Sequence, residues 1–213
     1  MRVESIDYKS AVDFLLPRHY SGRKPQIKWA FGWFTDNGEL VAVCTFGKPA
    51  SNSLCRGICG DEYSQNVYEL NRLCREQRMT PPISQFVAKC LRLLKPENVI
   101  VVSYSDTAMN HHGYVYQACN FLYTGATKAR TDLYTPKGKH SRHYKKGEKS
   151  EYRKVRSSKH RYVYFCTSDK KLKKKWMKSL RYEVQQYPKG DNNPDYELGN
   201  YLQDKLIRVS KIK

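Results

Sequence analysis

Residues 98–125 read "NVIVVSYSDTAMNHHGYVYQACNFLYTG", and they carry the clearest secondary-structure pattern in the sequence. Its first half is a nearly continuous apolar run, which is typical of a strand buried on both faces. That strand ends at Ser105 and Asp106, and a short aromatic helix over 111–121 and a second strand follow. A buried strand followed by a helix and another strand predicts a sheet covered by helices, with polar side chains where the buried strand ends.

The sequence before this stretch predicts further strands and a helix. "IKWAFGWF" (27–34) and "ELVAVCTFG" (39–47), separated by "TDNG", predict a hairpin, because Asp-Asn-Gly between two β-rich runs favours a tight turn. "VYELNRLCRE" (67–76) predicts a third strand, which follows a loop over 48–66. In "SQFVAKCLRLLK" (84–95) the apolar residues recur at helical spacing, and Ser84 is placed as a possible N-cap.

The two ends of the chain add a helix and further strands. Residues 1–16, "MRVESIDYKSAVDFLL", carry acids among the apolar residues, so they predict an amphipathic helix, stopped near Pro17, rather than a signal peptide. Two more strands are predicted over 121–130 and 161–168. The whole pattern predicts an α/β (α+β) fold.

Cysteine content and hydropathy indicate the compartment. The seven cysteines are an odd number without a CxxC pair, which favours a reducing environment and packing thiols over metal ligands. No stretch approaches the roughly 20 apolar residues that span a bilayer. We therefore expect a cytoplasmic protein that makes no membrane contact, and its oligomeric state is left open.

Positive charge is the strongest global feature: 39 Lys and Arg against 20 acids give a net charge of +19. Residues 137–161 hold eleven basic residues against two acids, and residues 170–178 add six lysines. Such an excess is favourable beside a polyanion, where each phosphate contact releases a counterion. The interleaved aromatic residues predict rings that stack on bases; they are Tyr144, Tyr152, Tyr162, Tyr164 and Trp176. The alternative is a solvated basic loop.

The order of the predicted elements resembles the Gcn5-related N-acetyltransferase fold, chiefly over residues 67–125, where "QACNFLYTG" is similar to that family's helix and following strand. The resemblance implies a mixed, mostly antiparallel sheet flanked by helices. The family's pyrophosphate loop usually carries glycines, whose amides approach phosphates at a helix N-terminus. Here the loop is "EQRMTPPISQ" (76–85), which lacks glycine, so coenzyme A is not expected to bind in the usual way.

A more specific resemblance involves several segments in the same order, within residues 15–135. They are "HYSGR" (19–23), "ELVAVCTFGKPAS" (39–51), "YELNRLCRE" (68–76) with "PPISQFVAKCLRLL" (81–94), and "SYSDTAMNHHGYVYQACNFLYTG" (103–125). Together they resemble the Mom-type DNA modification proteins of bacteriophages, a divergent branch of the acetyltransferase fold. The resemblance implies conversion of adenine in double-stranded DNA to N6-carbamoylmethyladenine, which protects the DNA from host restriction. The change to a basic and then a polar pattern after about residue 170 predicts a catalytic domain over 1–168, with a basic insertion at about 137–161, and a C-terminal extension over 169–213.

Four residues are predicted to serve catalysis. Asp106, at the end of a buried strand, is placed to accept or orient the proton of the adenine amine, and the alternative is a helix cap. Tyr116 offers a phenol on the next helix, and the alternative is core packing. His19 and Tyr20 match the "HY" element of the family.

Anion binding is predicted on a strand and on the loop after it. With a period of two, Arg72 shares a strand face with Tyr68, Leu70 and Cys74 and needs an anionic partner, either a donor carboxylate or phosphate or a neighbouring Glu69 or Glu76. Arg78, Thr80 and Ser84 are further candidate ligands of the donor, acetyl-CoA or another acyl or aminoacyl group. A rigid structural turn is the alternative for that loop.

No metal site is predicted. His111 and His112 are adjacent, so on a helix their rings diverge by about 100° and do not readily share one metal. An iron ion held by one of them with Asp106 and Tyr116 is the alternative. Gly113 indicates close approach of a ligand or another backbone.

We therefore expect a DNA-modifying transferase that flips an adenine into a pocket near Asp106. Double-stranded DNA is the expected partner, gripped by Lys145, Lys146, Arg153 and Lys154. Two alternatives remain: a noncatalytic nucleic-acid-binding protein, and an ordinary N-acetyltransferase acting on protein or small-molecule amines.

Overall fold

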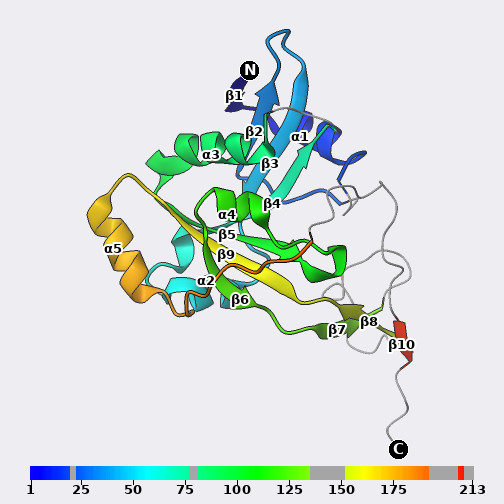
Figure 1. Ribbon diagram of the computed structural model, residues 1–213, viewed down its shortest axis with the longest axis vertical. Helices are drawn as coiled ribbons and strands as arrows, with labels where there is room; N and C mark the ends of the chain where they lie inside the picture. The colour runs from blue at the N-terminus through cyan, green and yellow to red at the C-terminus, as the bar shows by residue number, and fades with distance from the viewer. Residues whose placement is uncertain (20–22, 77–80, 135–151, 192–205, 209–213) are drawn as a thin grey trace, which may run out of the picture.

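A seven-stranded sheet forms the centre of the computed structural model, which describes residues 1–19, 23–76, 81–134, 152–191 and 206–208 (Figure 1). The strand order is β1-β2-β3-β4-β5-β9-β6, and every pair is antiparallel except β4 with β5. The strands are β1 (Arg2–Ser5), β2 (Trp29–Phe34), β3 (Leu40–Gly47), β4 (Val67–Arg75), β5 (Val99–Asp106), β6 (Leu122–Ala126) and β9 (Lys159–Cys166). The predicted α/β fold with a mixed, mostly antiparallel sheet is confirmed.

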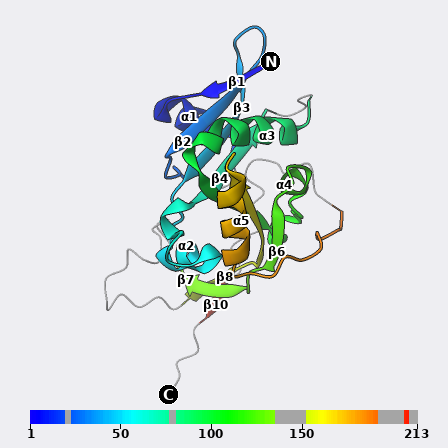
Figure 2. The ribbon, with the colours of Figure 1, turned by 90° about the vertical axis from the view of Figure 1, so that its left-hand side faces the viewer.

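Helices cover both faces of this sheet (Figures 1 and 2). Side chains of β5 alternate between the two cores: Val99 and Val101 join one, while Ile100 and Val102 join the other. The first core packs under α3 (Ile83–Leu94) and α4 (Tyr114–Ala118), on what we call the α3 face. The opposite α2 face carries α1 (Tyr8–Leu15), α2 (Asn52–Cys59) and α5 (Lys170–Ser179).

A second, smaller sheet extends from the edge of the main sheet (Figure 1). It contains β7 (Arg130–Leu133), β8 (Tyr152–Arg156) and β10 (Leu206–Arg208), in the order β10-β8-β7. Because β8 continues into β9 after two residues, β7 and β8 form an arm that prolongs strands of the main sheet. Residues 152–156, expected within a basic loop, are therefore a paired strand.

Three local expectations are wrong. Residues 2–5 do not begin a helix but form β1, which pairs with β2, and α1 starts after Asp7, whose carboxylate caps it. The expected loop over 48–66 contains α2 and a 3-10 turn, Ser64–Asn66. Ser84 is not an N-cap, because α3 begins one residue earlier, after Pro82.

The cysteines behave as packing residues. All seven lie in the described residues, are buried and are free of disulfides. Each belongs to one of the hydrophobic cores. Burial raises the pKa of the Cys59 and Cys74 thiols to about 11, so these groups stay protonated at neutral pH. In the described parts of the chain, no helix is long and apolar enough to cross a bilayer.

Candidate functional site at the divergence of β4 and β5

The two parallel strands β4 and β5 separate near the middle of the sheet. They pair only from Val67–Glu69 to Ile100–Val102, and beyond this point β4 continues to Arg75 and β5 to Asp106. Because the strands are parallel, their carboxyl ends open at the same edge of the sheet, which is where crevices form in such folds. The side chains that line this divergence therefore make up the candidate site.

Asp106 ends β5 and is held by three donors. Its Oδ1 accepts from the amide of Ala108 at 3.0 Å and from the hydroxyl of Ser157, and its Oδ2 lies 3.3 Å from Nζ of Lys159. Asp106 thus caps the 3-10 turn Thr107–Met109, so the cap that was the alternative role for this residue is present. The cap does not close the site, since 16% of the Asp106 side chain stays exposed. The carboxylate is fixed in orientation and still accessible.

An irregularity in β4 sets the position of Arg72. Thr45 of β3 is opposite Arg72, but the next residue, Phe46, is opposite Leu70, so Asn71 is an extra residue in β4. Consecutive β3 residues point to opposite faces, so Arg72 does not share a face with Tyr68 and Leu70 as predicted. The predicted face of Arg72 is wrong because it assumed a regular strand, and the sequence has no clear signal for the bulge at Asn71.

The bulge brings Arg72 onto the α2 face with Glu69. Burial raises the pKa of the Glu69 carboxyl, and the positive charges of Arg72 and Lys159 partly offset this rise. The Arg72 guanidinium also donates to the Asn71 carbonyl at 2.6 Å and to the Arg23 carbonyl at 3.5 Å. Glu69 is thus the neighbouring acid that the sequence offered as an alternative partner of Arg72, and it also lies within electrostatic reach of Lys159, the partner of Asp106. Lys159 was not predicted as a site residue.

His19 lies next to this group. It is 9% exposed, and burial, followed by repulsion from Arg72, lowers the pKa of its imidazole to about 3. His19 is therefore neutral at physiological pH. The structure thus brings three predicted residues, His19, Arg72 and Asp106, to one side of the sheet.

Tyr116 lies elsewhere. Its ring packs against Phe121 and Tyr162 on the α3 face, with ring centroids 5.4 and 5.3 Å apart. Asp106 pairs with Lys159, which belongs to the opposite face of β9 from Tyr162. The structure therefore does not bring the phenol and the carboxylate together, and a catalytic role for Tyr116 stays a prediction.

The loop before α4 is fixed by aromatic packing. Gly113 has a φ of +74°, and a Cβ there would lie 2.5 Å from a ring carbon of Tyr162. The Tyr162 hydroxyl donates to the carbonyl of His112, whose ring lies 5.8 Å from that of His160. The close neighbour expected at Gly113 is therefore a side chain of β9. Among the described residues, no group of three His, Cys, Asp or Glu side chains is arranged to hold a metal ion.

A C-terminal segment braces the same loop. Residues 180–191, which we call the strap, run from α5 along β6 to α4 (orange in Figure 1). The amide of Gln185 donates to the Tyr123 carbonyl at 2.9 Å, and the Tyr187 hydroxyl donates to the Phe121 carbonyl at 2.7 Å. At its end, the Tyr114 hydroxyl donates to the carbonyl of Gly190 at 2.7 Å. This brace could not be predicted from the sequence, because its contacts are mostly with backbone groups.

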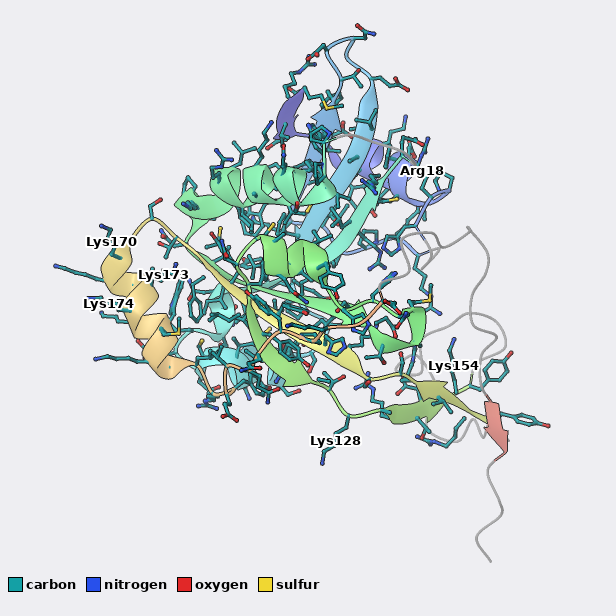
Figure 3. All side chains as sticks on the ribbon, viewed as in Figure 1. Arg18, Lys128, Lys154, Lys170, Lys173 and Lys174 are labelled. Carbon is teal, nitrogen blue, oxygen red and sulfur yellow. The ribbon has the colours of Figure 1, made fainter. Side chains whose placement is uncertain are left out.

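The remaining predicted residues lie on α3, on the arm or outside the described residues. Ser84 is the second residue of α3, where its hydroxyl and the helix N-terminus are compatible with an anion. Arg153 of β8 donates to the hydroxyl and carbonyl of Thr131, at 2.7 and 2.8 Å, so its guanidinium holds the arm together. Lys154 lies on the same strand (Figure 3). Outside the described residues are Tyr20, Arg78, Thr80, Lys145 and Lys146.

The expected stacking rings are mostly unavailable. Trp176 and Tyr162 are 0% exposed, and Tyr164 is partly buried and packs on the core near Phe121. Tyr152 is exposed, and Tyr144 lies outside the described residues. The prediction of base stacking is therefore wrong for Trp176 and Tyr162, which serve packing.

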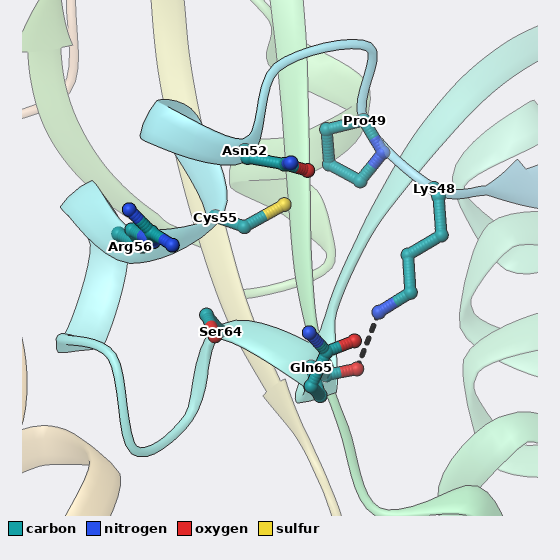
Figure 4. A pocket seen from close by; sticks show the side chains of 7 residues that line it. All are labelled: Lys48, Pro49, Asn52, Cys55, Arg56, Ser64 and Gln65. Atoms are coloured by element: carbon teal, nitrogen blue, oxygen red, sulfur yellow. Dashed lines mark hydrogen bonds between the residues drawn. The ribbon is translucent and has the colours of Figure 1, made fainter.

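A separate polar pocket lies beside α2 (Figure 4). The Lys48 ammonium, which faces it, donates to the carbonyls of Gln65 and Val67, and Arg56 pairs with Asp61 at 3.0 Å. None of the predicted site residues lines this pocket. Since its two cations are already engaged by the protein, we do not assign the site to it.

The sequence matches a known protein family. Residues 1–189 match the model of the Mom protein family. The chain belongs to the Mom family. This match continues beyond residue 168, so it includes α5 and nearly all of the strap. The division at residues 168 and 169 remains a prediction.

One curated relative is "Methylcarbamoylase mom" of Escherichia phage Mu, which is 28% identical over 131 residues. The matched region covers 59% of this chain and 54% of the relative, so it spans about half of that protein's length.

Solved structures of acetyltransferases have similar folds. A putative acetyltransferase from Acinetobacter baylyi has a TM-score of 0.48 and 10% identity, covering 77% of this chain and 92% of the other. An N-acetyltransferase from Staphylococcus aureus has a TM-score of 0.47 and 11% identity, covering 78% and 98%. At these values the similarity says nothing of substrate or donor.

Proposed function

We propose that this Mom family member is a phage DNA modification enzyme that converts adenine in double-stranded DNA to N6-carbamoylmethyladenine and so protects the DNA from restriction. The observation that carries the proposal is the fixed, accessible carboxylate of Asp106, paired with Lys159 at the divergence of β4 and β5, in a chain of this family. The name of the phage Mu relative, a methylcarbamoylase, supports the transferred group. The site of action is the host cytoplasm.

Asp106 serves the adenine amine. The lone pair of N6 is delocalised into the ring, so the amine is a poor nucleophile unless a neighbouring group orients it or accepts its proton. The adenine must also leave the base stack, because N6 cannot be attacked within the duplex. A carboxylate held by three donors keeps one geometry, which suits an acceptor that orients the extruded base. His19, neutral and buried near Arg72, is proposed to line the base pocket. Tyr20, which follows it in the sequence, lies outside the described residues and stays a candidate.

The donor is proposed to bind through its anionic group. Arg72 faces the divergence with Glu69, and Arg78, Thr80 and Ser84 belong to the loop and helix start that follow β4. The usual coenzyme A loop does not fit this chain: Pro81 and Pro82 precede α3 and lack amide donors, and the loop has no glycine. Direct attack on acetyl-CoA would also leave an N-acetyl group, whereas the proposed product has a CH2 bonded to nitrogen. Any simple acyl or aminoacyl transfer likewise leaves a carbonyl carbon on N6, so the proposed product needs either a donor that is attacked at its CH2 carbon or further chemistry after the acyl transfer.

Nucleoside analysis tests this function. DNA from cells that express the chain is digested and its nucleosides are separated by mass spectrometry, with DNA from cells carrying an empty vector as the control. The proposal predicts a new adenine-derived nucleoside with the added mass of a carbamoylmethyl group. Unmodified DNA together with tight duplex binding would instead support a noncatalytic DNA-binding protein. An N-acetylated protein or small amine, with unmodified DNA, would support an ordinary acetyltransferase.

A further inference from the structure

Helix α5 is a lysine-rich surface that lies apart from the candidate site and from the arm. Six of its ten residues are lysines and none is acidic. All six are exposed, and Lys170, Lys173 and Lys174 project from the outer side of the helix (Figure 3). Figures 1 and 2 place α5 on the opposite side of the molecule from β7 and β8. No salt bridge among the described residues includes any lysine of α5.

These charges oppose the stability of the helix. Lys170, Lys174 and Lys178 follow one another at intervals of four residues, where like charges on a helix repel. Lys170 and Lys171 also occupy the first turn, where the helix dipole disfavours cations. Asp169 offsets part of this cost, because its carboxylate accepts from the amides of the first turn. A bound polyanion would offset this repulsion among the lysines, because its phosphates attract them and release counterions.

The opposite side of α5 is firmly attached to the protein. Trp176 is 0% exposed, packs with Phe165 and Tyr63, and accepts at its carbonyl from the thiol of Cys59. Leu172, one turn earlier, joins the same core. The helix is therefore held rigidly, with the row Lys170, Lys174 and Lys178 on the side away from Trp176. Successive lysines of this row are about 6 Å apart along the axis.

The side chains of α5 indicate which kind of polyanion binds there: a membrane surface, a single nucleic-acid strand or a duplex. A membrane-bound amphipathic helix inserts its apolar side, but here that side is buried in the protein. Proteins that hold single strands stack bases on exposed aromatic rings, and the only aromatic residue of α5 is buried. Lysine ammonium groups act as point charges, which suit backbone phosphates without reading the bases. Duplex DNA fits these features best.

We propose that α5 is a second phosphate-binding surface, which contacts the backbone of duplex DNA away from the base that is modified. The inference rests on the proposed function, which supplies the duplex. Contacts of this kind hold an enzyme on DNA without sequence preference and are lost steeply as salt rises.

Salt-dependent binding to a duplex tests the surface. One variant combines Lys170→Gln, Lys174→Gln and Lys178→Gln, which keep helix propensity and leave Trp176 in place. Its matched control combines Lys9→Gln, Lys89→Gln and Arg92→Gln, which remove the same charge from α1 and α3. The probe is a fluorescent duplex of random sequence, and the single strand is measured beside it.

The α5 variant should flatten the plot of log K against log salt for the duplex by about 2 to 3 units, since each lost phosphate contact removes about 0.9. The control should change the slope by less than one unit, and the single strand should be affected less than the duplex. Equal slopes for the α5 variant and the unchanged protein, or equal losses in both variants, would overturn the inference. A larger loss on the single strand would also overturn it. Modified adenine in cells would still be detected in these cases, so failure here is distinct from failure of the proposed function.

Discussion

Replacing Gly113 by alanine should destabilise the protein by about 3–4 kcal/mol, and the structure indicates where this comes from. The φ of +74° at Gly113 costs an alanine about 1–2 kcal/mol. Its Cβ would also meet the Tyr162 ring at 2.5 Å. Tyr162 is fully buried, its hydroxyl donates to the His112 carbonyl, and it accepts from the Gln117 amide at 3.2 Å. Moving the ring breaks these two bonds, each of which contributes about 1 kcal/mol.

Gly38 provides the matched control, because its φ is +84° but an added Cβ would have no atom within 4 Å. Gly38→Ala should therefore cost only the backbone part, about 1–2 kcal/mol. Urea unfolding of both variants and the unchanged protein, with equal m values, gives the two free energies. If Gly113→Ala costs no more than Gly38→Ala, then Tyr162 does not fix the loop before α4, and the account of that loop is refuted.

Three further predictions concern other parts of the molecule. The pKa of His19, lowered to about 3 from an ordinary 6.5, means that its contribution to stability is full above pH 6.5 and is lost as pH falls toward 3. His19→Gln should therefore flatten the stability profile in this window, by up to about 1.4 kcal/mol per pH unit, and an unchanged profile from chemical unfolding would contradict burial of the neutral imidazole. Alanine at four basic positions of residues 137–161 should weaken duplex binding on every sequence and lower the salt slope by a few units, whereas an unchanged slope would exclude this segment as the grip. These positions are Lys145, Lys146, Arg153 and Lys154. Tyr116→Phe should reduce modification if the phenol takes part in the chemistry; full activity with an unchanged melting temperature would assign the ring to packing.

The sequence predicted the central elements because their signals are local. The apolar run of β5, the Asp-Asn-Gly turn between β2 and β3, and the helical spacing in α3 each specify one element through its own residues. The N-terminal strand β1 was missed, because four residues with charges carry little strand signal and its pairing with β2 supplies the stability.

The candidate site was predicted only in part, since its geometry depends on contacts between distant residues. The position of Asp106 could be predicted, because it depends only on where the apolar run of β5 ends. The position of Arg72 could not, because the extra residue at Asn71 reverses the faces of β4 and brings Glu69 to its side. Lys159 was predicted only as part of a basic segment, and its pairing with Asp106 follows from the register of β5 with β9.

The most direct test of the central claim is the yield of modified adenine in cells that express Asp106→Asn. Asparagine caps a helix about as well as aspartate and keeps one acceptor oxygen, and the ion pair that it loses involves a partly exposed Lys159, so stability should change by at most about 1 kcal/mol. Removing the carboxylate should lower modification by about 100-fold to 10,000-fold, while duplex affinity and melting temperature stay close to those of the unchanged protein. Full modification by Asp106→Asn, at matched expression and with an unchanged melting temperature, would contradict the assignment of the chemistry to the divergence of β4 and β5.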